Sequence, residues 1–279
     1  MDSVRIFAAL PIACLFVFTS IATPAQSGSF QVALRGQHIG TASFSFTSTA
    51  EGYDSTSAVR VSMKGLDYAL SKTERLSRAN KLRHVQLSAV VNGSAVHVTA
   101  APDTAQLLLN ISANGRSTTV RLAAHPATVF LPDFDPGALE TLLTLGVAHN
   151  NRDLWVILPK QSGDKSGTVE PVQLATYADE KGTLDGKPIA VHHLIATYAG
   201  ASTDLFSGPE NQLLQAELPQ QGFALVRKGF VLTPPAKPIA PPSGEDSLDP
   251  VAPAAPASTS SGSVSSSGVG SAPASSVMQ

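Results

Sequence analysis

Two adjacent histidines are the side chains in this sequence that are best suited to acid–base or metal chemistry. His192 and His193 lie inside an apolar stretch, 191–195, and imidazole is the side chain that changes charge near neutral pH. Neighbouring residues on a strand point to opposite faces of a sheet, so these two rings are not expected to bind one ion. The pattern predicts one histidine in the interior and one outside. The other five histidines are scattered without metal-ligand spacing.

Three acidic residues near the middle of the chain resemble a fragment of a calcium-binding loop. Asp133, Asp135 and Glu140 are closely spaced, and Gly137 lies between them. A calcium loop places oxygen ligands at about five of twelve positions, whereas apolar residues occupy most of the positions between these acids. Capping of a helix by Asp135 explains the pattern more simply. We therefore predict no metal site and no cofactor.

The serines and paired acids lack the surroundings that catalysis requires. No serine stands in the glycine-flanked strand-to-helix elbow of the hydrolases. Asp179 and Glu180 are followed by Lys181 and Gly182, which is typical of a solvated turn. We predict no catalytic residue. A hydrolase with a non-standard arrangement stays open as an alternative, because triads are defined by geometry rather than by sequence.

The N-terminus has the three-part plan of a secretory signal peptide over residues 1–25. Arg5 precedes an apolar run, 6–21, and a small-residue exit ends at Ala25. The run is shorter than the roughly 20 residues that a membrane-spanning helix needs. The only cysteine, Cys14, lies inside it, and we expect cleavage after Ala25 rather than lipidation. The predicted mature chain has no thiol and no transmembrane span, and is periplasmic or extracellular.

Composition divides the remaining chain into a domain, 27–232, and a tail, 233–279. The domain has equal numbers of basic and acidic residues, whereas nucleic-acid-binding proteins carry a basic excess, so no nucleic-acid partner is expected. The tail is rich in Pro, Ala and Ser and has no aromatic residue. It cannot bury enough apolar surface to offset the entropy of ordering, and we expect it to be disordered.

Short alternating apolar runs separated by turn signals predict an antiparallel sheet in the domain. The first hairpin is expected over 30–46. Asn92-Gly93 and Asn114-Gly115 each separate two alternating runs, and Asn-Gly favours a tight hairpin turn because both central residues need positive φ. Further strands are predicted at 154–158, 172–177, 189–198, 212–218 and 224–228.

One helix is predicted over 136–148. Asp135 can cap its free amides, and Pro136 suits the first turn. Leucines and a valine at three-and-four spacing form one face, with Glu140 and two threonines opposite. We therefore expect a mainly β fold with one amphipathic helix that packs its leucine face on the sheet.

The closing stretch of the domain resembles that of bacterial envelope proteins of unknown function. The residues that carry the resemblance are 186–189, 212–219 and 222–227, within the segment 172–230. Such families are similar to periplasmic lipoprotein carriers and localisation factors. The resemblance implies a strongly curved antiparallel sheet, a half-barrel or open barrel, that holds acyl chains beneath a helical lid.

The resemblance also implies an apolar pocket between sheet and helix, which is the chemistry that an acyl chain needs. The predicted lining residues are Phe44, Phe46, Leu107, Leu109, Leu139, Leu142, Leu143, Val191 and Ile195. The alternative is that the same residues simply form a filled core, because alternation of side chains does not distinguish a cavity from packing. The leading hypothesis is an exported, non-enzymatic binding protein for an apolar small molecule or lipid. The alternatives are an envelope module that recruits another protein through an exposed sheet edge, and a hydrolase.

Overall fold

A computed structural model of the protein describes residues 26–148, 153–159 and 167–234. The predicted signal peptide and nearly all of the predicted tail lie outside these residues. All of the described residues belong to one unit of the fold.

The described chain is mainly β, with a short α-helix that continues into a π-helical segment. The strands are β1 (Ser27–Leu34), β2 (Gln37–Ser48), β3 (Gly52–Met63), β4 (Leu66–Ser77), β5 (Leu82–Val91), β6 (Ser94–Asp103), β7 (Gln106–Ala113), β8 (Arg116–Ala123), β9 (Ala127–Phe130), β10 (Leu154–Leu158), β11 (Thr168–Thr176), β12 (Glu180–Leu184), β13 (Lys187–Tyr198), β14 (Ala201–Ser207), β15 (Leu213–Leu218), β16 (Phe223–Arg227) and β17 (Phe230–Leu232). The helical segments are α1 (Pro136–Leu143) and η1 (Thr144–Ala148).

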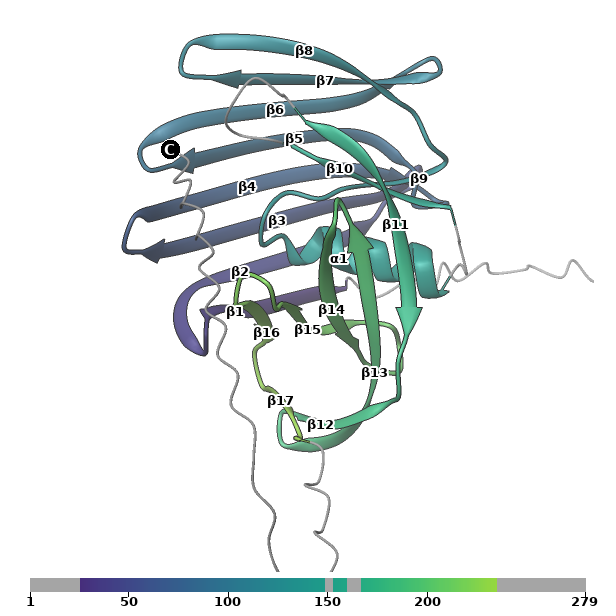
Figure 1. Ribbon diagram of the computed structural model, residues 1–279. Coiled ribbons are helices and arrows are strands. Elements are labelled where there is room, and N and C mark those ends of the chain that lie inside the picture. The colour runs from purple at the N-terminus through teal and green to yellow at the C-terminus, as the bar shows by residue number, and fades with distance from the viewer. Residues whose placement is uncertain (1–25, 149–152, 160–166, 235–279) are drawn as a thin grey trace, which may run out of the picture. The chain divides into compact units, whose positions relative to one another are not determined.

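These seventeen strands belong to one hydrogen-bonded sheet. From β1 the ladder runs in one direction through β2 to β8 in chain order. In the other direction it runs through β16, β15, β14, β13, β11, β10 and β9. β12 pairs with the first half of β13 and with β17. Among the described strands, β8 and β9 therefore end the main ladder, and the sheet does not close on itself (Figure 1).

Tight turns shape the large meander from β2 to β8. At the β5–β6 turn, Asn92 has φ 49° and Gly93 has φ 82°; at the β7–β8 turn, Asn114 has φ 51° and Gly115 has φ 73°. Positive φ at both central residues is the geometry that Asn-Gly was expected to provide. The first hairpin and both of these hairpins are confirmed.

β3 and β4 were not predicted, because polar residues occupy their inward-facing positions. On β3 the buried alternate residues include Ser55 and Ser57, and on β4 they include Lys72 and Glu74. Alternation of burial is regular along both strands, but alternation of hydrophobicity is not. Sequence patterns follow hydrophobicity and therefore miss a strand whose inner face is polar.

The expectation of a purely antiparallel meander needs one correction. β9 and β10 are parallel, with Leu154 opposite Ala127 and Ile157 opposite Phe130. All four residues of β9 are buried, so this strand has no alternation to reveal it. Parallel neighbours need a crossover connection, and the segment that contains α1 supplies it.

α1 is confirmed at its predicted start, but it is not amphipathic in its environment. The Asp135 carboxylate accepts hydrogen bonds from the backbone N–H groups of Gly137 and Ala138. Every residue of α1 is buried, including Glu140 and Thr141 on the face expected to be polar. The helix contacts β2 and β3 on the meander and also β9 and β15, so protein surrounds it (Figure 1). Among the described residues no helix has the length and apolarity to cross a membrane.

Candidate functional site

The predicted pocket-lining residues fall into different surroundings. Six belong to the main hydrophobic core, while Phe46 packs against that core partly buried. Val191 belongs to a second, smaller cluster with Phe206, Leu214 and Phe230, and Ile195 is half-buried. The six core residues are Phe44, Leu107, Leu109, Leu139, Leu142 and Leu143.

β13, the strand from which Val191 and Ile195 were predicted to line the pocket, is covered by apolar residues on both faces. β13 has apolar clusters on both of its faces: Leu194 and Ala196 face the main core, whereas Val191 faces the smaller cluster. Residues with odd and even numbers point to opposite faces of a strand. A single inward face could not be read from a strand that is covered on both sides.

The space beneath the leucines of α1 is filled. Leu142 and Leu143 are fully buried, and Leu139 is nearly so, within the main core. One pocket of the described structure has Leu139 in its lining, and none of the other eight predicted lining residues. That pocket therefore lies at the N-terminal end of α1 rather than beneath the helix.

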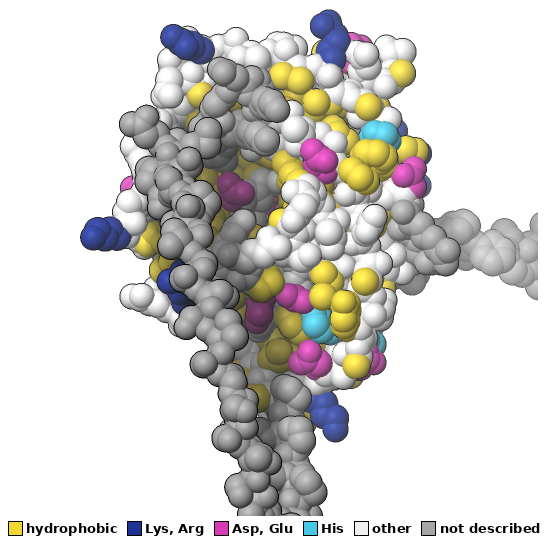
Figure 2. Space-filling view, viewed as in Figure 1, with side chains coloured by type: hydrophobic (Ala, Val, Ile, Leu, Met, Phe, Trp, Pro, Cys, Tyr) yellow, Lys and Arg dark blue, Asp and Glu magenta, His cyan; other side chains and the backbone are white. Residues whose placement is uncertain are grey.

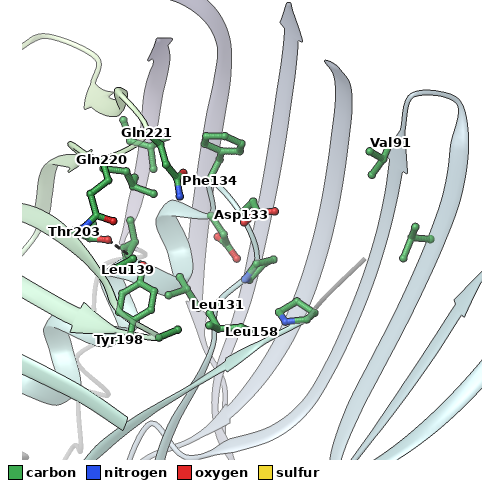
Figure 3. A pocket seen from close by; sticks show the side chains of 18 of the residues that line it. Val91, Leu131, Asp133, Phe134, Leu139, Leu158, Tyr198, Thr203, Gln220 and Gln221 are labelled. Carbon is green, nitrogen blue, oxygen red and sulfur yellow. Dashed lines mark hydrogen bonds between the residues drawn. The ribbon is translucent and has the colours of Figure 1, made fainter. Parts of the chain in front are cut away.

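The pocket has a volume of about 720 Å³ and is open on one side. Its walls come from the β5–β6 and β7–β8 turns, the loop before α1, the end of β10, the β13–β14 turn and the residues after β15. Apolar residues outnumber polar ones in the lining, and Figure 3 shows Leu131, Leu139 and Leu158 near the polar residues Asp133, Tyr198, Thr203, Gln220 and Gln221, with Val91 farther off on the β5–β6 side. Volume and composition both fall within the range of small-molecule sites.

The loop 131–135 places Asp133 in the pocket. The N–H of Leu131 donates to the carbonyl of Ile157 at 2.9 Å, which extends the parallel pairing of β9 and β10 by one residue. Phe134 has φ 57°, a left-handed conformation that is uncommon for a residue with a side chain. This turn separates two nearby acids: Asp133 lines the pocket, whereas Asp135 is buried at the start of α1.

Phe134 is held in place by other aromatic rings. Its ring centroid lies 4.9 Å from that of Phe223 and 6.2 Å from that of Tyr68, in edge-on geometry in both cases. Such pairs add about 0.5–1.5 kcal/mol beyond area burial. The wall of the pocket at this point is therefore anchored to β16 and β4.

Asp133 and Tyr198 are the titratable side chains that characterise the pocket. Asp133 is an exposed residue that lines the pocket, and the surrounding protein, which displaces part of the water around its carboxylate, raises its pKa. Burial also raises the pKa of Tyr198, against a lowering effect of its hydrogen bond to Thr203, and the nearby Asp133 charge adds to the rise. The Tyr198 hydroxyl lies 3.0 Å from the Thr203 hydroxyl. A carboxylate and a phenol thus share a mostly apolar space.

A second polar group, the Lys72 cluster (Lys72, Glu74 and Asp135), is fully enclosed. Lys72 Nζ lies 2.6 Å from Asp135 Oδ2 and 3.0 Å from Glu74 Oε2, and all three side chains are fully buried. Burial alone would lower the pKa of Lys72, but the two carboxylates raise it well above its usual range. Burial raises the pKa of Glu74 despite the neighbouring ammonium. The cluster fixes the start of α1 to β4.

Ser57 is the cross-strand neighbour of Lys72, which brings a hydroxyl near an amine. A serine–lysine nucleophile needs a neutral amine as its base. Lys72 is held in its charged form by two carboxylates and has no exposed surface. This pair therefore has a structural role.

Glu140 joins α1 to two other parts of the sheet. One carboxylate oxygen accepts the backbone N–H of Leu213 at 2.7 Å, and the other accepts a hydrogen bond from the Gln26 side chain. Burial raises its pKa to about 7, although these hydrogen bonds and the Arg227 charge act in the opposite direction. Glu140 is therefore a buried acid that gains or loses its proton near neutral pH.

The acids once grouped as a calcium-loop fragment face three different environments. Asp133 lines the pocket, Asp135 pairs with Lys72, and Glu140 binds Leu213. Within the described part of the chain no group of three or more His, Cys, Asp or Glu side chains is arranged to hold a metal ion.

His192 and His193 lie on opposite sides of β13, as the alternation predicts. His192 is partly exposed, with Nδ1 2.9 Å from Asp179. His193 is more enclosed: Nε2 lies 2.9 Å from Asp204 and Nδ1 3.4 Å from Glu180, while its ring stacks on Phe206 with centroids 4.5 Å apart. Both ring nitrogens of His193 face carboxylates, so neither is free to take a proton from a nucleophile.

One serine–histidine contact occurs on the outer surface. The Ser88 hydroxyl lies 3.1 Å from His97 Nδ1, and both side chains are exposed on β5 and β6. Neither lines the pocket, and among the described residues no carboxylate is hydrogen-bonded to His97. The orienting group and enclosed cavity of a triad are thus missing from this pair.

The pocket was not found from the sequence, because its lining comes largely from turns and strand ends. Asp133 was singled out as an acid, but the other polar lining residues, Tyr198, Thr203, Gln220 and Gln221, have no spacing that groups them. No protein-family model, curated protein or solved structure matches this chain. The geometry of the described residues is therefore the basis for inferring what the pocket binds.

Proposed function

We propose that this chain is an exported, non-enzymatic binding protein that holds a small, mostly apolar ligand in the pocket at the N-terminal end of α1. The observation that carries the proposal is the pocket itself, with a volume of about 720 Å³ and a lining in which apolar residues outnumber polar ones. Apolar side chains suit a ligand that gains affinity by leaving water, and the polar ones among them can fix its orientation. Export follows from the signal-peptide pattern of the sequence.

The proposal keeps the apolar ligand of the sequence-based hypothesis and moves its position. A ligand beneath the helix would have to displace Leu142 and Leu143, which are fully buried in the core. A ligand at the end of α1 displaces no core residue. In this proposal the sheet curves around the core as in a half-barrel. The ligand binds at the open end of that half-barrel, and the core residues fill its interior.

The proposal is tested with a variant that fills the pocket. Ala201 lines the pocket, whereas Ala123 is exposed at the end of β8. We expect the neutral fluorescent probe N-phenyl-1-naphthylamine to bind the wild type and Ala123→Trp, and to bind Ala201→Trp at least tenfold more weakly. Mass spectrometry of organic extracts should show the same order for any co-purified ligand. Equal probe binding by all three proteins, or by none, would refute the proposed site.

One observation favours the interaction-module alternative. β8 is paired only with β7 among the described strands, and six of its eight residues are exposed. An unpaired edge can accept a strand from another protein. The measurement is cross-linking in the cell envelope, where a Pro substitution at Thr119 in β8 should abolish capture of a partner. Failure to enrich any partner over a control would count against this alternative.

A further inference from the structure

The charged residues among the described lining of the pocket are all acidic. Its described lining residues include no Lys, Arg or His, and the two acids among them are Asp133 and Asp135. Asp135 already has partners, because it caps α1 and forms an ion pair with Lys72. Asp133 is therefore the charged residue of the described lining whose carboxylate can pair with a ligand. On the face shown in Figure 2, most of the lysine and arginine side chains lie toward the rim of the molecule, whereas acidic side chains also occur near its middle.

Asp133 also lacks a partner of its own. Within the described part of the chain its carboxylate has no hydrogen bond or ion pair, and the surrounding protein raises its pKa, with no donor or cation to oppose the shift. Asp133 is an exposed residue of the open pocket, so a ligand can reach its carboxylate. A hydrogen-bond donor on the ligand would pair with this carboxylate, and a charged donor would bind it most strongly.

The neighbouring groups suit a cation better than an anion. The Tyr198 and Phe134 rings line the same pocket as Asp133 (Figure 3), and aromatic faces attract ammonium groups. Gln220 and Gln221 supply neutral amides that can bind either a donor or an acceptor. An anionic head, such as the carboxylate of a free fatty acid, would meet Asp133 as a like charge.

We propose that the ligand is an apolar amine, with an alkyl or aryl body among the leucines and a protonated amino group paired with Asp133. This inference rests on the proposed function, because it names the ligand class of the same pocket. It adds a head group to the acyl-chain ligand that the resemblance to lipoprotein carriers implied, for which no head group was specified. The apolar body fits the same walls in either case, so the head group decides the selectivity.

Three probes with one alkyl chain separate the head-group effect from the apolar one. Octylamine, 1-octanol and octanoate are titrated into the full exported chain by calorimetry at pH 8, where the amine is protonated and octanoate is ionised. We expect octylamine to bind about tenfold more tightly than 1-octanol, and octanoate to bind more weakly than either. In Asp133→Asn the amine and alcohol affinities should come within about twofold of each other.

The matched control is Asp103→Asn, an exposed acid at the end of β6 that does not line the pocket. This variant should keep the wild-type order of affinities. Octanoate binding as tightly as octylamine, or an unchanged preference in Asp133→Asn, would overturn the amine inference while leaving the proposed function standing. Failure of all three probes to bind the wild type would overturn both.

A pH titration supplies an independent readout. The titratable groups facing Asp133 in the described structure are Tyr198 on β13 and the neighbouring Asp135, which is held by Lys72. Since the pKa of Asp133 is raised, its charge is lost at a higher pH than that of an ordinary aspartate, and octylamine should bind progressively more weakly as the pH falls. The affinity of 1-octanol should stay constant over the same range. Parallel curves for the two probes would contradict the pairing.

Discussion

Replacing Lys72 with methionine tests how the buried charge cluster holds α1 on the sheet. The substitution keeps an unbranched apolar stem and removes the ammonium group, whose Nζ lies 2.6 Å from Asp135 Oδ2 and 3.0 Å from Glu74 Oε2. Removing one partner from a buried ion pair costs about 3–5 kcal/mol, because it leaves an uncompensated charge in the interior. Lys72→Met should therefore lower the free energy of unfolding by that order.

Two features place the expected loss at the lower end of this range. Asp135 keeps the backbone N–H groups of Gly137 and Ala138 as donors. Glu74 already has a raised pKa because of its burial, so it can take up a proton once the ammonium is gone. We expect a loss of about 3 kcal/mol at pH 7, shrinking as the pH is lowered, because Glu74, whose pKa is raised by burial, is then more readily protonated.

The matched control lies on the same strand. Arg75 pairs with Asp54 at 3.9 Å, and these side chains are 75% and 51% exposed. Exposed pairs contribute about 0–1 kcal/mol, so Arg75→Met should have almost no effect. Urea unfolding followed by circular dichroism measures both variants, with a shifted midpoint and an unchanged slope. A Lys72→Met protein as stable as Arg75→Met would show that the cluster contributes nothing net, and would refute the reasoning.

Glu140 and Gly137 lead to two further predictions. Burial raises the pKa of Glu140 from its ordinary value of 4.5 to about 7, so the stability due to its protonated form is full below pH 4.5 and is lost as the pH rises through 7. Relative to Glu140→Gln, the wild type should lose about 3 kcal/mol of unfolding free energy between pH 4.5 and 8 in urea titrations, and identical pH profiles would contradict the assignment. A Cβ added at Gly137 would lie 2.5 Å from the Ser57 hydroxyl oxygen and 3.1 Å from the Phe44 side chain, so Gly137→Ala should raise the unfolding rate and cost about 1–3 kcal/mol. Adding Ser57→Ala should restore part of that loss, and strict additivity of the two substitutions in thermal unfolding would argue against the contact.

Local signals in the sequence were sufficient for much of the sheet. Asn92-Gly93 requires a tight turn wherever it stands between two apolar alternating runs, and the structure places a hairpin there. The same holds for Asp135 before Pro136, where capping and a preset φ start α1 at the predicted residue. These predictions depend on neighbours in the chain alone, which is why they succeeded.

Features that depend on distant neighbours could not be read in the same way. Lys72 and Glu74 look like surface residues until Asp135 is brought against them from the loop before α1. Val191 looks like a core residue of the main sheet, but it packs in the second cluster on the opposite face of β13. Sequence patterns show which residues share a face, and they do not show what lies opposite that face.

The candidate site was the least predictable part for the same reason. Of its polar residues, Asp133 stood out only as a member of an acidic group, and the fold disperses that group. Tyr198 and Gln221 come to the pocket from elements that meet only after the sheet is complete. Residues contributed by turns have no regular spacing in the sequence, so the sequence pattern does not predict the pocket that they line.

The position of β1 inside the ladder has a consequence for the order of folding. β1 lies between β2, its immediate neighbour in the chain, and β16, near the end of the domain. Ser27 accepts a hydrogen bond from Arg227, 200 positions further along. The meander from β2 to β8 can assemble from successive local hairpins, but joining the two parts of the sheet must wait until β16 has been synthesised. Long-range pairing of this kind slows folding, so the step that joins the two ends of the domain should limit the rate at which the pocket takes shape.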